Sequence, residues 1–161
     1  MWQKIQKFLS PKAALIAGLA AGTVYLVFMF ALLPLAAGVD GALFIRYSGA
    51  LILGPDALVE HTTTVFIVGL AVHYLISILL AFLIAIVVFR WGMAVGIIGG
   101  ALLGLAFYAI NLYLLTLIFP WFFAINSPLL LAAHVLFGAV AGGVYEALDR
   151  YDQPIFQENA P

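Results

Sequence analysis

Two histidines, His73 and His134, lie inside long apolar runs of the sequence. An ionisable side chain in a membrane-spanning segment is costly, usually faces the interior of the helix bundle, and by default indicates a functional site. A small residue, Ser77 or Gly138, follows each histidine one helical turn later. Histidine is a regular axial ligand of haem, and the small residues would leave room for the ring. The pattern therefore predicts a cofactor site at His73, His134, Ser77 and Gly138, with haem b as a candidate.

The same two histidines are compatible with other chemistry. They could bind a metal ion, contact a quinone or relay protons. A purely structural role is the main alternative, in which neutral imidazoles hydrogen-bond to neighbouring helices and hold them together. Polar side chains elsewhere in the apolar runs could be their partners: Tyr74, Tyr108 and Asn111 are the main candidates, and Tyr25, Tyr113 and Thr116 supply further polar atoms.

The third histidine, His61, lies in the segment DALVEHTTT, next to Glu60 and close to Asp56. Imidazole and carboxylate groups together can bind a divalent cation, so His61 and Glu60 form a candidate metal site. The simpler interpretation is a solvated helix start, which the threonines at 62–64 would cap. The sequence contains no cysteine, which excludes disulfides, thiolate metal sites and iron–sulfur clusters.

Glycines spaced by four residues recur in three of the apolar runs. This spacing puts small residues on one face of a helix and lets two backbones approach closely, which is how helices associate in lipid. We therefore expect helix packing at Gly18, Gly22, Gly92, Gly96, Gly100, Gly104, Gly138 and Gly142. The run at 92–104 carries the most such glycines and is expected to be the central packing helix.

The composition indicates that these residues are positioned by membrane-spanning helices. Of 161 residues, 66% are hydrophobic and 8% are charged, which is too few charges to cover a surface in water. About 20 apolar residues cross the hydrocarbon layer, and four stretches are long enough: about 13–37, 64–89, 91–119 and 128–148. In lipid each segment must pair its own backbone amides, so helices are expected. The predicted fold is a single all-α domain, a four-helix transmembrane bundle.

The basic residues predict how the bundle is oriented. One side of the predicted membrane carries most of them, namely Lys4, Lys7, Lys12, Arg90 and Arg150, and the other side carries Arg46. The positive-inside rule then places both termini in the cytoplasm and the protein in the inner membrane. The net charge of −1 and the lack of a basic patch argue against nucleic acid as a partner.

Two segments outside the four spans are themselves partly apolar. The outer loop, about 38–63, contains ALFIRYSGALIL, which could be an interfacial or a re-entrant helix that caps the bundle. The N-terminal MWQKIQKFLS places apolar residues against lysines and predicts a short interfacial helix lying on the membrane.

The four spans could form two related helical hairpins. GLAAG at 18–22 resembles GALLG at 100–104, and LAVH at 70–73 resembles LAAH at 131–134. If the hairpins are related, they form a parallel repeat about an axis along the membrane normal.

The layout from AGLAAGTVYLVFMF to HVLFGAVAGGVYEAL resembles small bacterial inner-membrane proteins of a four-helix family of unknown function. That resemblance implies a four-helix fold and no particular activity. The paired intramembrane histidines are also similar to those of four-helix cytochrome b anchors, but the usual set of four histidines is incomplete here, since the chain has three.

Three functions are compatible with these features. The first expectation is an accessory or structural subunit of a larger membrane complex, such as a respiratory one, whose glycine faces pack on partner subunits. The second is a bis-histidine haem b or quinone-linked electron-transfer protein. The third is a small homo-oligomeric channel or transporter with the histidines lining its path. An enzyme is less expected, because the sequence has no HExxH motif and no nucleophile elbow.

Overall fold

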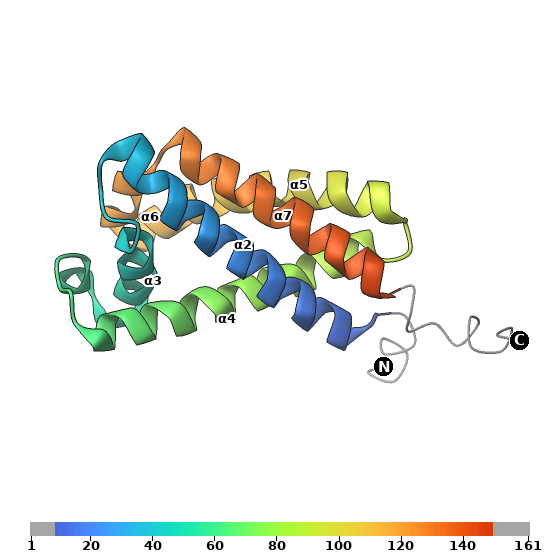
Figure 1. Ribbon diagram of the computed structural model, residues 1–161, viewed down its shortest axis with the longest axis horizontal. Helices are drawn as coiled ribbons and strands as arrows, with labels where there is room; N and C mark the ends of the chain where they lie inside the picture. Colours follow the sequence, from blue (N-terminus) through green and yellow to red (C-terminus); the bar gives the residue numbers. More distant parts are fainter. Residues whose placement is uncertain (1–8, 150–161) are drawn as a thin grey trace, which may run out of the picture.

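The computed structural model describes residues 9–149, and every regular element in this range is helical. Four helices are long and apolar enough to cross a membrane: α2 (Pro11–Ala37), α4 (Thr63–Val88), the continuous helix Met93–Ile118 and α7 (Pro128–Asp149). They run up and down in turn, so the chain enters and leaves at the same end of the bundle (Figure 1). The predicted all-α four-helix bundle is confirmed, and the four apolar helices indicate a multi-pass membrane protein.

Two ends of the bundle are distinguished below. The terminal end is where α2 begins at Pro11 and α7 finishes at Asp149, and the loop end is where α2 finishes and α4 begins. The interfacial helix predicted at the N-terminus lies outside the described residues, as do Lys4, Lys7 and Arg150.

Side-chain caps fix where two of the helices begin. The Ser10 hydroxyl accepts a hydrogen bond from the Ala13 N–H, and Pro11 opens α2 because its fixed φ suits the first helical turn. The Thr62 hydroxyl accepts from the Val65 N–H in the same way at the start of α4. Thr62 thus has the capping role expected of the threonine run, and the predicted spans match the helices to within two residues.

The third span is not one regular α-helix. It consists of α5 (Met93–Ala109), a π-helical turn η2 (Ile110–Leu114) and the short α6 (Leu115–Ile118). A π turn is rare, adds one residue to the turn, and often occurs at functional sites. A 3-10 segment, η3 (Pro120–Ile125), then leads to α7.

Helices α5 and α7 touch along a row of glycines. Gly100 and Gly138 face each other so closely that a methyl group added to either would strike the carbonyl of the other. Gly96 meets Gly142 in a similar way, and Gly104 lies against the carbonyl of His134. The two backbones are therefore in direct contact, which only glycine permits at these positions.

Gly92 has a different role from the one predicted. It precedes α5 in the turn after α4 and has a φ of 88°, which glycine adopts without strain. Its N–H donates to Oε2 of Glu146 on α7, at 3.0 Å. Gly92 therefore ties this turn to α7 at the terminal end and does not belong to the packing row.

Helices α2 and α4 also pair through glycines. Gly18 lies against the backbone of Ile78, and Gly22 lies against Ser77. Both α2–α4 and α5–α7 are thus antiparallel pairs with glycines at the contact, the arrangement that two related hairpins would have. The two pairs are not joined symmetrically, because α2 packs along α7 whereas α4 and α5 make few contacts. The side of the bundle between α4 and α5 is therefore its least closely packed side.

A short helix, α3 (Leu43–Leu53), crosses the loop end of the bundle and is followed by the 3-10 turn η1 (Pro55–Leu58) (Figure 1). With 11 residues, α3 is too short to cross a membrane. Phe44 and Ile45 are buried, and a methyl group added to Gly69 of α4 would strike the Ile45 carbonyl. The structure therefore has α3 packed against α4 at the loop end.

Candidate functional site

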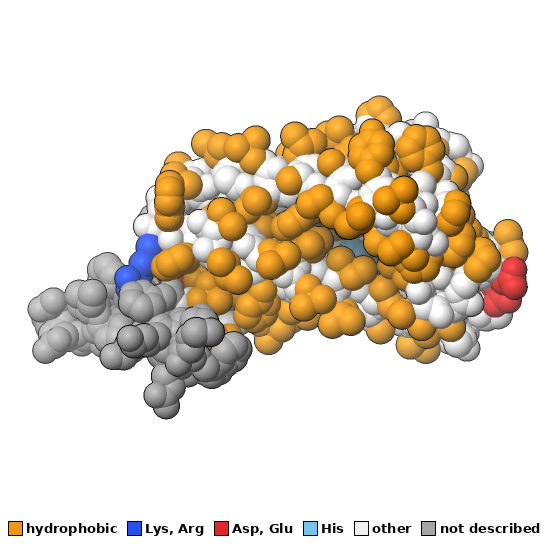
Figure 2. Space-filling view, turned by 180° about the vertical axis from the view of Figure 1, so that it is seen from behind, with side chains coloured by type: hydrophobic (Ala, Val, Ile, Leu, Met, Phe, Trp, Pro, Cys, Tyr) orange, Lys and Arg blue, Asp and Glu red, His pale blue; other side chains and the backbone are white. Residues whose placement is uncertain are grey.

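A cavity of about 100 Å³ lies in the bundle, toward the loop end. Side chains from α2, α3, α4, the third span, η3 and α7 line it, and both His73 and His134 are among them. At about 1.5 Å per helical residue, His73 lies roughly 15 Å and His134 roughly 9 Å from the loop-end starts of their helices. The face seen in Figure 2 is largely hydrophobic between charged side chains at its two ends, and histidine surface is visible in a hollow in its middle.

Tyr25 of α2 contacts both histidines. Its ring centroid lies 5.5 Å from that of His73 and 5.4 Å from that of His134. Phe44 of α3 contacts both Tyr25 and His73, with centroid distances of 5.8 Å in each case. Sequence reasoning counted Tyr25 only as one polar residue among several. Its contact with both histidines follows from how α2 is rotated against α4 and α7. The spacing of residues within α2 does not reveal this rotation.

The two imidazoles are each fixed by a backbone carbonyl. His73 Nε2 lies 3.0 Å from the Gly22 carbonyl oxygen, and His134 Nδ1 lies 2.8 Å from the Leu130 carbonyl oxygen. A carbonyl oxygen can only accept, so these two ring nitrogens carry the protons. Leu130 is one turn before His134 on the same helix, whereas Gly22 belongs to α2. The His73 bond therefore joins α2 to α4 and is also a structural link between them.

The π turn brings Asn111 to the cavity wall. Its Nδ2 lies 3.4 Å from His134 Nε2, a long contact in which the amide donates. The structure thus places Asn111 beside a histidine, as the sequence suggested. Tyr108 and Tyr74 contact His134 and His73 only through their rings, at centroid distances of 5.7 and 5.3 Å. Their hydroxyls are engaged elsewhere, by Asn126 and Thr23 respectively.

The two small residues expected beside the histidines differ in position. Ser77 lines the cavity together with His73. Gly138 does not line it, because it is packed into the glycine row against Gly100. Gly138 therefore serves the contact between α5 and α7 and does not widen the cavity beside His134.

The residues present do not fit a haem. An iron held by both histidines would need open space beside both imidazoles, and the Tyr25 ring packs against each of them. The cavity of about 100 Å³ is also far too small to enclose a porphyrin, which has four pyrrole rings. A porphyrin would require α2 to move out of the bundle.

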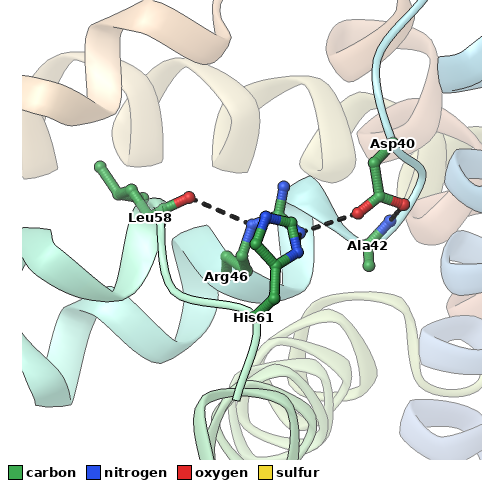
Figure 3. A network of polar contacts seen from close by, with 5 residues as sticks. All are labelled: Asp40, Ala42, Arg46, Leu58 and His61. Atoms are coloured by element: carbon green, nitrogen blue, oxygen red, sulfur yellow. Dashed lines mark hydrogen bonds and ion pairs between the residues drawn. The ribbon is translucent and has the colours of Figure 1, made fainter.

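Of the predicted metal residues, His61 lies in a different network, at the loop end (Figure 3), and Glu60 beside it in the sequence is exposed. Arg46 is its centre: Nε donates to the Leu58 carbonyl at 3.1 Å, and Nη1 pairs with Asp40 at 2.8 Å. The same Nη1 lies 3.3 Å from Nδ1 of His61. A guanidinium beside His61 opposes cation binding there. Within the described residues no group of three or more His, Cys, Asp or Glu side chains could hold a metal ion.

Asp40 is held in its charged form by this network. The hydrogen bond from the Ala42 N–H, followed by the one from Arg46, keeps the pKa of the Asp40 carboxyl below its usual value. Arg46 is the buried member, with a side chain 11% exposed, against 52% for Asp40. The network therefore fixes the start of α3 to the chain that follows it.

The terminal end holds a buried carboxyl, that of Glu146 on α7. Glu146 is 2% exposed, and its Oε2 accepts from the Gly92 N–H while Oε1 has no hydrogen-bond partner. Tyr145 beside it is completely buried, and its hydroxyl accepts from the Ser10 N–H at 3.4 Å. These contacts join both ends of the described chain to the turn between α4 and α5.

The chain matches no model of a protein family, and no curated protein and no solved structure is significantly similar to it. The resemblance to a bacterial four-helix family therefore remains a prediction, and the site alone supports what is proposed about function.

Proposed function

We propose that this protein binds a membrane-dissolved amphiphile with a neutral, single-ring head group, of the quinone class. The observation that carries the proposal is the composition of the cavity wall: two imidazoles, three phenols, two serine hydroxyls and one amide stand among aromatic and aliphatic side chains. Pockets of this kind, apolar with a few convergent polar groups, are typical of small-molecule sites.

The lining selects against charged head groups. No aspartate, glutamate, lysine or arginine is among the cavity residues. A phosphate or carboxylate transferred into such a site would lose its hydration without gaining an opposite charge. The walls instead offer aromatic faces, from Tyr25, Phe44, Tyr108, Phe122 and Phe137. These rings suit the faces of a planar, uncharged ring.

A route from the lipid lies between α4 and the third span. Ile76 and Leu80 on α4, and Asn111 and Leu115 on the opposite wall, line the cavity while remaining partly exposed. These residues form the rim of the hollow, on the side where α4 and α5 make few contacts. A head group inside the cavity would leave its apolar tail in the hydrocarbon outside this rim.

The other two functions draw less support from the geometry. The accessory-subunit hypothesis depended on glycine faces available to partners, but those of α2, α5 and α7 are used inside the chain. The channel hypothesis needs a path to the terminal end. Buried small side chains fill that half of the bundle, among them Ala17, Ala21, Ala81, Ala85 and Ala141.

Binding can be measured with 2-decyl-1,4-benzoquinone and its quinol, titrated into the protein in lipid nanodiscs. We expect saturable binding of at least one form. Asn111→Leu removes the amide at the rim with little change in volume and should weaken binding about tenfold, the effect of one lost hydrogen bond in a dry site. Tyr113→Phe is the control, because Tyr113 belongs to the same π turn but is 62% exposed and outside the cavity. Absence of saturable binding for both forms would refute the proposed function.

The proposed location is the inner membrane, with both termini in the cytoplasm. Lys12 and Arg90 lie at the terminal end and Arg46 at the loop end, which supports this orientation. The chain has no cysteine, so single cysteines report its orientation directly. A membrane-impermeant maleimide should label Glu60→Cys in intact cells and Trp91→Cys only after permeabilisation. The reverse pattern would show that the orientation is inverted.

A further inference from the structure

The hydrogen bonds of the two histidines leave one ring nitrogen of each without a proton. His73 Nε2 donates to the Gly22 carbonyl, and His134 Nδ1 donates to the Leu130 carbonyl. An additional proton on either ring would place a charge inside the membrane, in a wall that contains no carboxylate. Each imidazole is therefore neutral, and His73 Nδ1 and His134 Nε2 carry lone pairs that can only accept.

Only one of these lone pairs is engaged within the described residues. His134 Nε2 receives the long contact from Asn111, at 3.4 Å. His73 Nδ1 makes no hydrogen bond that the structure records. Both imidazoles stand in the cavity wall in contact with Tyr25, so the cavity presents two acceptors at positions fixed by backbone carbonyls.

Resting on the function proposed above, we infer that the cavity selects the reduced, hydroxyl-bearing quinol over the oxidised, carbonyl-bearing quinone. A quinol hydroxyl can donate to an imidazole lone pair. A quinone carbonyl can only accept, and next to the same nitrogen it would leave two acceptors facing each other in a site with little water. A buried acceptor without a donor loses its hydration and gains no hydrogen bond in return, so we expect discrimination of tenfold or more. Tyr25, Ser77 and Asn111 do not decide the choice, because a hydroxyl or an amide can both donate and accept.

The test compares the two redox forms of one probe. The affinities of 2-decyl-1,4-benzoquinol and 2-decyl-1,4-benzoquinone are measured on the full chain in nanodiscs, under anaerobic conditions. We expect the quinol to bind at least tenfold more tightly. Tenfold tighter binding of the reduced form raises the midpoint potential of the bound couple by about 30 mV, which provides a second reading of the same ratio. Equal affinities, or tighter quinone binding, would overturn the inference while leaving the proposed function in place. No binding of either form would overturn both.

Glutamine variants separate selection from folding. In His73→Gln or His134→Gln the amide can turn and present either a donor or an acceptor. The ratio of quinol affinity to quinone affinity should therefore fall toward one, while quinone binding is retained or improved. His61→Gln is the control, because His61 lies in the loop-end network, outside the cavity, and should keep the wild-type ratio. An unchanged ratio in both cavity variants would overturn the inference.

Nuclear magnetic resonance of the imidazole nitrogens tests the premise without any ligand. Long-range proton–nitrogen correlations of ¹⁵N-histidine-labelled protein should show His73 protonated at Nε2 and His134 protonated at Nδ1. The opposite form at His73, or a doubly protonated ring at neutral pH, would remove the basis of the selection and overturn the inference.

Discussion

At the scale of single residues, the glycines show how little space the bundle leaves between its helices. Adjacent glycines of α5 have very different surroundings: Gly100 faces the backbone of Gly138, whereas a methyl group at Gly99 would make an ordinary contact with Val88, at 3.4 Å. The two positions share the same helix and nearly the same depth. Alanine substitutions at the two positions therefore distinguish the effect of close packing from the general preference of helices for alanine.

Gly100→Ala should destabilise the protein by about 2 kcal/mol, because the added methyl group must push α5 and α7 apart. Gly99→Ala should be neutral or stabilising by up to about 1 kcal/mol, since alanine is the better helix former. Unfolding in mixed micelles with rising dodecyl sulfate, followed by tryptophan fluorescence, compares them. Equal stabilities for the two variants would contradict the close contact between α5 and α7.

At the scale of elements, α3 forms one wall of the cavity and is held in place by a few contacts. Phe44, Tyr47, Ser48 and Leu51 of α3 line the cavity. The helix is fixed on one side by its close approach to Gly69, and on the other by the network of Arg46. Because Arg46 is buried and Asp40 is half-exposed, the arginine bond to the Leu58 carbonyl is the more protected part of this network.

Asp40→Asn should loosen α3 without unfolding the bundle. We expect the backbone amides of α3 to exchange hydrogen about two- to fivefold faster in the variant than in the wild type, because a partly exposed ion pair contributes little stability. The pKa of Asp40 is lowered in the folded protein, so its carboxylate contributes above the usual carboxyl pKa of about 4 and this contribution is lost as pH falls through the lowered value. The two proteins should therefore exchange alike in strong acid, which hydrogen-exchange mass spectrometry can check. A difference in exchange rate that persists in strong acid would exclude the charge of Asp40 as the cause.

At the scale of the whole molecule, the weak contact between α4 and α5 gives the bundle one open side. Leu80 lies at the rim of the hollow and lines the cavity, whereas its neighbour Leu79 is 56% exposed and does not. The open side results from the asymmetry of the two helix pairs, since the corresponding side between α2 and α7 is closely packed.

Leu80→Trp should slow the association of 2-decyl-1,4-benzoquinol about tenfold or more, because the indole narrows the way from the lipid to the cavity. Leu79→Trp places the same side chain one residue away, in the lipid, and should leave the rate unchanged. Stopped-flow mixing of nanodiscs with the quinol measures both. Wild-type association in Leu80→Trp would show that the ligand reaches the cavity by another side.

The sequence predicted the bundle better than the site, for a physical reason. Length and hydrophobicity set the four spans, because any helix in lipid must satisfy its backbone internally. The histidines were recognisable because an ionisable group at depth is rare. Two features of the site depend on how whole helices are rotated against each other. Tyr25 contacts both histidines, and Gly138 packs in the glycine row and not in the cavity wall. The turn role of Gly92 depends on a positive φ, which its four-residue spacing concealed.

The cavity lies mainly toward the loop end, above a half of the bundle that is filled with alanines. A molecule that reaches it sideways therefore comes from the lipid leaflet on that side. Occupancy then follows the concentration of the amphiphile in that single leaflet, and not its total amount in the membrane. A shift of the amphiphile from one leaflet to the other would fill or empty the site while the composition of the membrane stayed the same.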